Sequence, residues 1–298
     1  QLSESPQAAV NMNTMIQSMV SLRPNPELWR THRQELTDPW VGPGASRHKS
    51  MIVDVAHSLI DQWVDEEKVD FVSQFAQPLP QMVMAKVLGW PIEDLKLLKH
   101  FGDGTVKAFV YGSGHRCILP TEEVRSQLEV LQEFQAYTNA LIAARRSAPE
   151  EDMITFLTTV EYSPLNRKLT DAEINGIVYA MVIGGLETTQ YALAEQVQLV
   201  IEKHAVWQAL KADKRKVRAF TEEGMRLRAP TQGLSTRTTS QEEVFQGVAV
   251  PKGSFLHMRW AAANIDPLEW DDPTELKLDR KAGTRHLTFS QGARVCPG

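Results

Sequence analysis

The sequence predicts a mainly α-helical protein with small β-sheets. Apolar residues recur at helical spacing over long stretches, whereas segments with strand character are short and gather between residues 234 and 259. The longest helical stretch opens with a capping box, in which Thr170 is the N-cap and Glu173 follows three residues later. No Pro/Gly/Ser-rich linker and no internal repeat divides the 298 residues, so we expect one domain over residues 1–298.

The expected elements follow from these patterns in chain order. In segment 48–64, Ile52, Val55, Leu59 and Trp63 lie near helical spacing, which predicts an amphipathic helix. The helices are expected at 26–37, 48–64, 81–88, 122–145, 171–203 and 217–228, and the strands at 234–238, 243–250 and 255–259.

Composition excludes several classes of protein. The formal net charge of -5 argues against nucleic acid as a partner. No run of 18 apolar residues is present, so no membrane span is expected in the chain. Two cysteines, Cys117 and Cys296, are too few for a disulfide framework, which predicts a reducing compartment and a cytoplasmic location.

The last ten residues carry a dense motif around one cysteine. Phe289, Gly292, Arg294, Cys296 and Gly298 form the pattern F-x-x-G-x-R-x-C-x-G. The glycines allow the backbone to turn where a side chain would clash. A thiolate presented on such a loop can hold a haem iron axially. The alternative is a buried free cysteine near a turn.

A second motif interrupts the long helix at 171–203. Gly184 and Gly185 are adjacent, and Glu187, Thr188 and Thr189 follow. Glycine in the middle of a helix destabilises it by about 1 kcal/mol relative to alanine. Two adjacent glycines at this position therefore indicate a structural or functional role. One reason is close packing of another helix against the glycines. The other is a functional opening in the helix.

Together these motifs resemble those of the cytochrome P-450 family, over about residues 24–298. The resemblance implies the cytochrome P-450 fold, which is helix-rich with a long central helix over the haem. It implies haem b (iron protoporphyrin IX) as cofactor and Cys296 as the axial ligand of its iron. It also implies that Gly185 makes room beside the haem, and that Glu187 and Thr188 relay protons to the side where dioxygen binds. The family's early N-terminal part and the segment after the cysteine loop are expected to be missing from this chain.

Further matches extend the resemblance. Trp29 and Arg33 resemble a helical W-x-x-x-R element, although such a pair on its own also fits a half-buried helix face. The resemblance implies that the haem propionates are held by Trp29, Arg33, Arg237 and Arg294, and that Phe289 lies against the haem.

A third motif, E-x-x-R, is formed by Glu223 and Arg226. Residues three apart on a helix can pair, and on a generic helix this would be a solvated ion pair of little value. The resemblance implies instead a structural network that Arg280 completes.

The implied function is a haem-thiolate monooxygenase. It would insert one oxygen atom of O2 into a small to medium apolar organic substrate, with two electrons from a ferredoxin or flavin-type donor. By position, Ala180, Ile183 and Gly184 would face the substrate, and Gly233 and Leu234 would line the opposite wall. The alternatives are a peroxide-driven hydroxylase or decarboxylase on the same fold, and a non-catalytic haem scaffold that binds a ligand.

Overall fold

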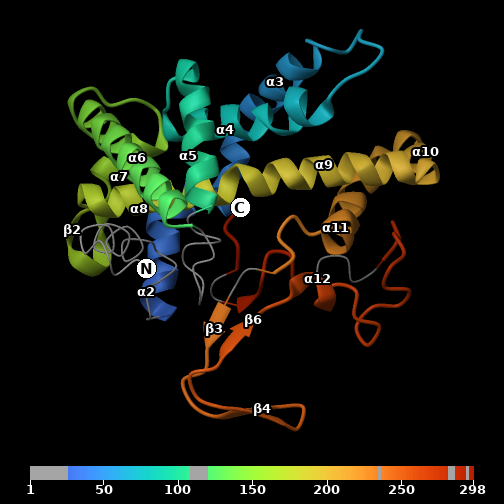
Figure 1. The fold of residues 1–298 in the computed structure, drawn as a ribbon. Coiled ribbons are helices and arrows are strands. Elements are labelled where there is room, and N and C mark those ends of the chain that lie inside the picture. The colour runs from blue at the N-terminus through green and yellow to red at the C-terminus, as the bar shows by residue number, and fades with distance from the viewer. Residues whose placement is uncertain (1–25, 108–119, 234–235, 281–285, 293–294) are drawn as a thin grey trace. The chain divides into compact units, whose positions relative to one another are not determined.

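A computed structural model describes residues 26–107, 120–233, 236–280, 286–292 and 295–298. These residues form mostly helices, together with three two-stranded antiparallel sheets (Figure 1). The predicted fold class, mainly α with small sheets, is therefore confirmed. The described residues fall into two compact units: one holds those up to Gln190 together with 292–298, and the other holds 191–291. That both belong to one domain stays a prediction.

The first unit is a group of helices and one very short sheet. Helices α4, α5, α6 and α8 pack against one another (Figure 1). Helix α2 continues into a π-helical turn, Arg33–Thr37, and a 3-10 helix, Gly42–His48, follows. The helices are α2 Pro26–His32, α3 Lys49–Ile60, α4 Pro78–Leu88, α5 Leu95–Lys107, α6 Thr121–Ser147, α7 Met153–Thr159 and α8 Asp171–Gly185, and β1 Glu161–Tyr162 pairs with β2 Arg167–Lys168.

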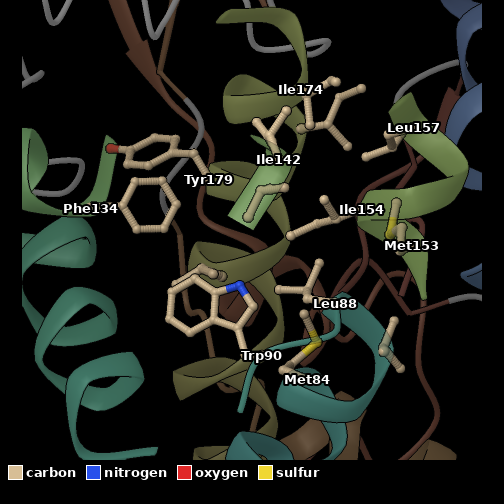
Figure 2. Packing of buried hydrophobic residues seen from close by; sticks show 14 of the residues in the cluster. Met84, Leu88, Trp90, Phe134, Ile142, Met153, Ile154, Leu157, Ile174 and Tyr179 are labelled. Carbon is tan, nitrogen blue, oxygen red and sulfur yellow. The ribbon is translucent and has the colours of Figure 1, made fainter. Parts of the chain in front are cut away.

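Aromatic and aliphatic side chains fill the centre of the first unit. Figure 2 shows Trp90, Phe134 and Tyr179 beside aliphatic residues of α6, α7 and α8. The Trp90 and Phe134 ring centroids are 6.3 Å apart, and Phe134 and Tyr179 meet edge to face at 5.9 Å. Each side chain of this size contributes about 1.5–3 kcal/mol when it is fully buried. This core fixes α8, the first half of the predicted long helix.

The second unit has a smaller core. Leu199, Leu210 and Phe220 are buried together, with Leu276 and Leu278 packed against them. Its elements are most of α9 Glu187–Glu202, α10 His204–Ala212, α11 Val217–Leu227, α12 Trp260–Ala263, the pair β3 Thr236–Thr238 with β6 Phe255–His257, and the pair β4 Glu243–Phe245 with β5 Val248–Val250.

All six predicted helices are present, with ends shifted by a few residues. The capping box is also confirmed: Thr170 Oγ1 accepts from the Glu173 N–H, and the Glu173 carboxylate accepts from the Thr170 N–H at 2.8 Å. The prediction of one helix over 171–203 needs a correction, because the helix is broken at Leu186 between α8 and α9. Helices α5, α7, α10 and α12 were not predicted.

The prediction of a single strand over 243–250 was wrong. The segment is a hairpin, in which Phe245 pairs with Val248 across a two-residue turn. Gln246 and Gly247 both have positive φ, 49° and 82°, the backbone that the tightest hairpin turns require. A glutamine at the first turn position hides the signal, because asparagine or aspartate is commoner there.

Among the residues described, no helix combines the length and the apolar character that crossing a membrane would need.

Candidate functional site

The break between α8 and α9 is bridged by a side chain. Leu186 departs from helical geometry, with φ −89° and ψ −77°. The Thr188 hydroxyl donates to the carbonyl oxygen of Gly184 at 2.5 Å, across the break. Threonine hydroxyls that bond back one turn tend to bend a helix, so the bond stabilises the distorted geometry. Thr188 is thereby held in one orientation at the break.

The two glycines at the break have different surroundings. A Cβ added to Gly185 would stand 2.8 Å from the Met84 sulfur, so this glycine allows α4 to pack closely. A Cβ added to Gly184 would meet no atom of the described residues within 4 Å. Close packing therefore explains Gly185, whereas no described residue outside its own helix occupies the space beside Gly184. A role of Gly185 beside a haem stays a prediction.

Glu187 is half-buried at the start of α9, and α5 packs close to the break. A Cβ on Gly102 would come within 2.8 Å of the Leu186 Cδ1 atom. The next residue, Asp103, pairs with Lys99 at 2.5 Å. Burial raises the pKa of Glu187, and the Asp103 carboxylate raises it further, while the Lys99 ammonium acts in the opposite direction. No sequence signal pointed to Asp103 or Lys99.

We expect substitutions of this ion pair to move the pKa of Glu187 in opposite directions. Asp103→Asn removes the repelling charge, so the carboxyl should ionise at lower pH than in the parent protein. Lys99→Met removes the stabilising charge, so it should ionise at higher pH. The measurement is the protonated carboxyl stretch in infrared difference spectra against pH, assigned by its loss in Glu187→Gln. Shifts in the same direction in both variants would contradict the predicted electrostatics.

The cysteine loop is held from the π-helical turn that follows α2. Ser290 and Gly292 have positive φ, 61° and 82°, and Cys296 is exposed. Arg33 Nη1 donates to the Val295 carbonyl oxygen at 2.7 Å and also pairs with Asp38 at 3.6 Å. Arg33, one of the residues predicted to bind a haem propionate, is therefore hydrogen-bonded to the backbone of the residue before the cysteine.

The other predicted propionate ligands are only partly described. Trp29 is buried, and its ring is stacked on His32 at 6.4 Å. Arg237 belongs to β3, opposite Leu256 of β6, but its side chain lies outside what the structure describes, as do Arg294 and Leu234.

The predicted substrate-facing residues occupy two settings. Ala180 and Ile183 of α8 are partly buried and pack against the core of the first unit. Gly233 lies in the second unit, where an added Cβ would come within 2.6 Å of the Met258 carbonyl oxygen. Its carbonyl accepts from His257 Nε2 at 2.7 Å. Backbone packing is thus sufficient to explain this glycine, and substrate contact by these residues stays a prediction.

One buried histidine stands next to Phe289 and was not anticipated in a functional role. Phe289 is itself exposed, and its ring centroid lies 5.8 Å from that of His286. His286 Nε2 is 3.2 Å from the Glu222 carboxylate on α11. The start of the cysteine loop is therefore connected to α11 through His286.

Glu223, Arg226 and Arg280 form one buried network in the second unit. Arg226 Nε and Nη2 donate to the two carboxylate oxygens of Glu223 at 2.8 and 3.0 Å, and Arg280 Nε lies 2.9 Å from Glu223 Oε1. Burial alone would raise the pKa of Glu223, but the bonds from Arg226 and the Lys277 N–H, with Arg280, hold it below its usual range. The Arg226 guanidinium also lies over the Trp270 ring, 5.0 Å from its centroid.

The residues present in the first unit fit a thiolate-ligated haem. Cys296 offers an exposed thiol, and an added Cβ at either Gly184 or Gly292 would contact none of the described atoms within 4 Å. Arg33 supplies a cationic donor bonded to the neighbour of the cysteine. A thiolate suits the haem iron, and a guanidinium suits a haem propionate carboxylate, so this pair of donors fits the cofactor.

The sequence profile of the cytochrome P-450 family matches residues 6–298. This chain belongs to the cytochrome P-450 family. Membership implies haem as the cofactor.

Bacterial members of the cytochrome P-450 family are among the relatives of this chain. The polyketide biosynthesis cytochrome P-450 PksS of Bacillus subtilis is 27% identical over 250 residues, covering 84% of this chain and 58% of PksS. A steroid C26-monooxygenase of Mycobacterium tuberculosis is 26% identical, covering 84% of this chain and 64% of its own length. The chain spans about three fifths of the length of the curated relatives it matches.

Solved cytochrome P-450 structures share the fold. P450BioI, crystallised with a fatty-acyl acyl carrier protein, superimposes with a TM-score of 0.86 over 97% of this chain and 72% of its own, at 24% identity. Mycobacterium smegmatis CYP164A2 with econazole bound superimposes with a TM-score of 0.81. The superposition covers 93% of this chain and 67% of the CYP164A2 chain, at 29% sequence identity.

Proposed function

We propose that this chain carries the catalytic part of a haem-thiolate monooxygenase. It inserts one oxygen atom of O2 into a small to medium apolar organic substrate and reduces the other to water. Two electrons come from a ferredoxin or flavin-type donor, the cofactor is haem b, and the location is the cytoplasm. The relatives are named for polyketide, biotin and steroid chemistry, so they do not favour one substrate.

The helix break with its acid–alcohol pair is the observation that carries this proposal. Thr188 is fixed across the break by its hydrogen bond to Gly184, and none of the described residues outside that helix occupies the space beside Gly184. Glu187 precedes Thr188 and has a raised pKa, so its carboxyl holds a proton at higher pH than usual. A ligand-binding scaffold has no need of an acid and an alcohol at this position, whereas an oxygenase must deliver protons there.

The haem, when bound through Cys296, supplies the redox chemistry that activates dioxygen. The protein's residues do the rest. Arg33 holds the carbonyl before Cys296, and the propionates are assigned to Trp29, Arg33, Arg237 and Arg294. The Thr188 hydroxyl donates to Gly184, which leaves its two lone pairs available to accept a hydrogen bond.

Thr188→Ala is the test of this function. The variant should keep haem, fold and substrate binding, because it only shortens one side chain and adds no atoms, but proton delivery should fail. Positioned proton transfer is typically worth about 10²- to 10⁴-fold in rate, so release of hydrogen peroxide should compete with product formation. The measurement is the ratio of product to hydrogen peroxide per reduced donor consumed. Thr189→Ala is the matched control, because Thr189 is exposed on the same helix.

Other outcomes of the same experiment favour the alternatives. Coupling at the parent level in Thr188→Ala would remove Thr188 from the mechanism. Equal product from added peroxide, with no electron donor, would favour a peroxide-driven enzyme. Electron consumption that does not depend on any tested substrate would favour a ligand-binding scaffold.

A further inference from the structure

The backbone on both sides of Cys296 touches the segment that follows α2. On one side, Arg33 Nη1 donates to the carbonyl oxygen of Val295 at 2.7 Å. On the other, Gly42 lies so close that an added Cβ would stand 2.8 Å from the carbonyl oxygen of Pro297. Both contacts lie within the first unit. The carbonyls immediately before and after the cysteine are thus in contact with one short stretch of chain.

Gly42 meets two separate requirements at this contact. Its φ is +53°, in the left-handed region that favours glycine. Its missing side chain leaves the space that the Pro297 carbonyl fills. Real Cβ atoms essentially never come as close as 2.8 Å, and a backbone carbonyl cannot swing aside like the end of a flexible side chain. The proline ring fixes the φ of Pro297, which further limits how that carbonyl can move.

The stretch that carries Gly42 is itself firmly anchored. Trp40 is buried in the core of the first unit, and the Arg47 guanidinium lies 4.4 Å from the centroid of its ring. His48 Nε2 bonds the Trp40 carbonyl oxygen at 3.1 Å. Arg33 pairs with Asp38 at 3.6 Å. A clash at Gly42 would therefore displace the cysteine loop more readily than the stretch itself.

We propose that Gly42 is a positioning residue for the thiolate of Cys296. Gly42 and Arg33 form a two-sided support that fixes the carbonyls before and after the cysteine, and this sets where the sulfur stands. The proposal rests on the proposed function, because it takes Cys296 as the ligand of the haem iron. It goes further in assigning control of that ligand to a residue far away in the sequence.

The test uses the haem-loaded protein with Gly42→Ala and Gly42→Asn. The readout is the ratio of the red-shifted Soret band, which reports thiolate ligation in the reduced CO complex, to the band at the ordinary position. Both variants should bind haem, and the ratio should fall about fivefold or more, the effect of a modest strain on a two-state equilibrium. Asparagine tolerates positive φ but still carries a Cβ, so it separates the contact from backbone strain.

Gly247→Ala is the matched control. Gly247 has a φ of +82° in the β4–β5 turn, and its added Cβ would meet none of the described atoms within 4 Å. This variant should keep the parent ratio. If Gly42→Ala keeps the band ratio of the parent protein, the proposal is overturned. If the ratio falls in Gly42→Ala but stays at the parent value in Gly42→Asn, the effect comes from backbone strain, and the proposal is overturned as well.

A second variant covers the case in which Gly42→Ala yields no haem-loaded protein. Adding Pro297→Gly to Gly42→Ala should then restore the yield of haem-loaded protein, because glycine at 297 lets the carbonyl turn away from the new methyl group. Failure to restore it overturns the proposal. Failure of the proposed function is a different result, since it would show as a red-shifted band that survives the loss of Cys296.

Discussion

Replacing Cys296 by histidine is expected to abolish the red-shifted Soret band of the reduced CO complex while haem stays bound. The red shift arises because a thiolate donates strongly to iron, and a neutral imidazole does not. Product formation should be lost with it, because the electron push that favours O–O cleavage comes from the sulfur. The measurements are the CO difference spectrum and the haem content of the purified variant.

The chain offers its own control for this substitution. Cys117 is the other of the two cysteines in the sequence, and Cys117→Ser should leave both the band and the haem content unchanged. An unchanged red-shifted band in Cys296→His would remove Cys296 as the ligand. Loss of the band in Cys117→Ser instead would move the ligand to a cysteine outside the motif.

Local sequence patterns predicted the features that short-range chemistry determines. The capping box at Thr170 and Glu173 depends on residues three apart, and the structure has both of its bonds. The Glu223–Arg226 pair lies one turn apart on α11 and is present with bidentate geometry. The adjacent glycines marked the weak point of the long helix, since two such residues weaken a helix wherever they occur, but the break itself was not predicted.

Contacts between distant parts of the chain could not be read in the same way. In the sequence, Gly42 looks like any loop glycine, and only the structure shows the Pro297 carbonyl beside it. Gly185 is required for packing because Met84 of α4 lies against it. Asp103 and Lys99 form an unremarkable helical ion pair, whose effect on Glu187 depends on how α5 packs at Gly102. Tertiary packing decides these roles, and a single sequence contains no record of it.

We expect substitution of the buried Glu223–Arg226 pair to have the largest effect on the stability of the folded protein. The side chains of Glu223 and Arg226 are 1% and 0% exposed, and that of Arg280 is 7% exposed. Arg226 also donates to the carbonyl oxygens of Asn264, Pro273 and Glu275, at 2.8, 2.6 and 3.0 Å. One guanidinium thus donates hydrogen bonds both to the Glu223 carboxylate and to backbone carbonyls of the segment that follows α12.

The pair also makes stability depend on acid. The folded-state pKa of Glu223 is lowered, so its carboxylate binds a proton less readily in the folded protein than in the unfolded chain. Its contribution is therefore present above the ordinary pKa of glutamate and is lost as the pH falls through the lowered folded value. The expected result is a transition midpoint that decreases on acidification in this range, and decreases less in a protein with Glu223→Gln.

Arg226→Ala is expected to destabilise the protein by about 3–5 kcal/mol, because a buried carboxylate and three carbonyls lose their donor. This is a large share of the stability of a typical domain, so little haem-loaded protein should remain. Arg226→Lys keeps the charge but loses the bidentate geometry, so its loss should be intermediate.

Arg228→Ala is the matched control for the buried arginine. Arg228 ends the same helix, and its side chain is 29% exposed in ion pairs with Glu195 and Glu202. Exposed pairs of this kind contribute about 0–1 kcal/mol, so this variant should behave almost like the parent. The measurements are haem content and the denaturant midpoint of unfolding. Equal midpoints for Arg226→Ala and Arg228→Ala would show that burial of the Glu223–Arg226 pair carries no stability of its own, and the structural role assigned to the E-x-x-R motif would fall.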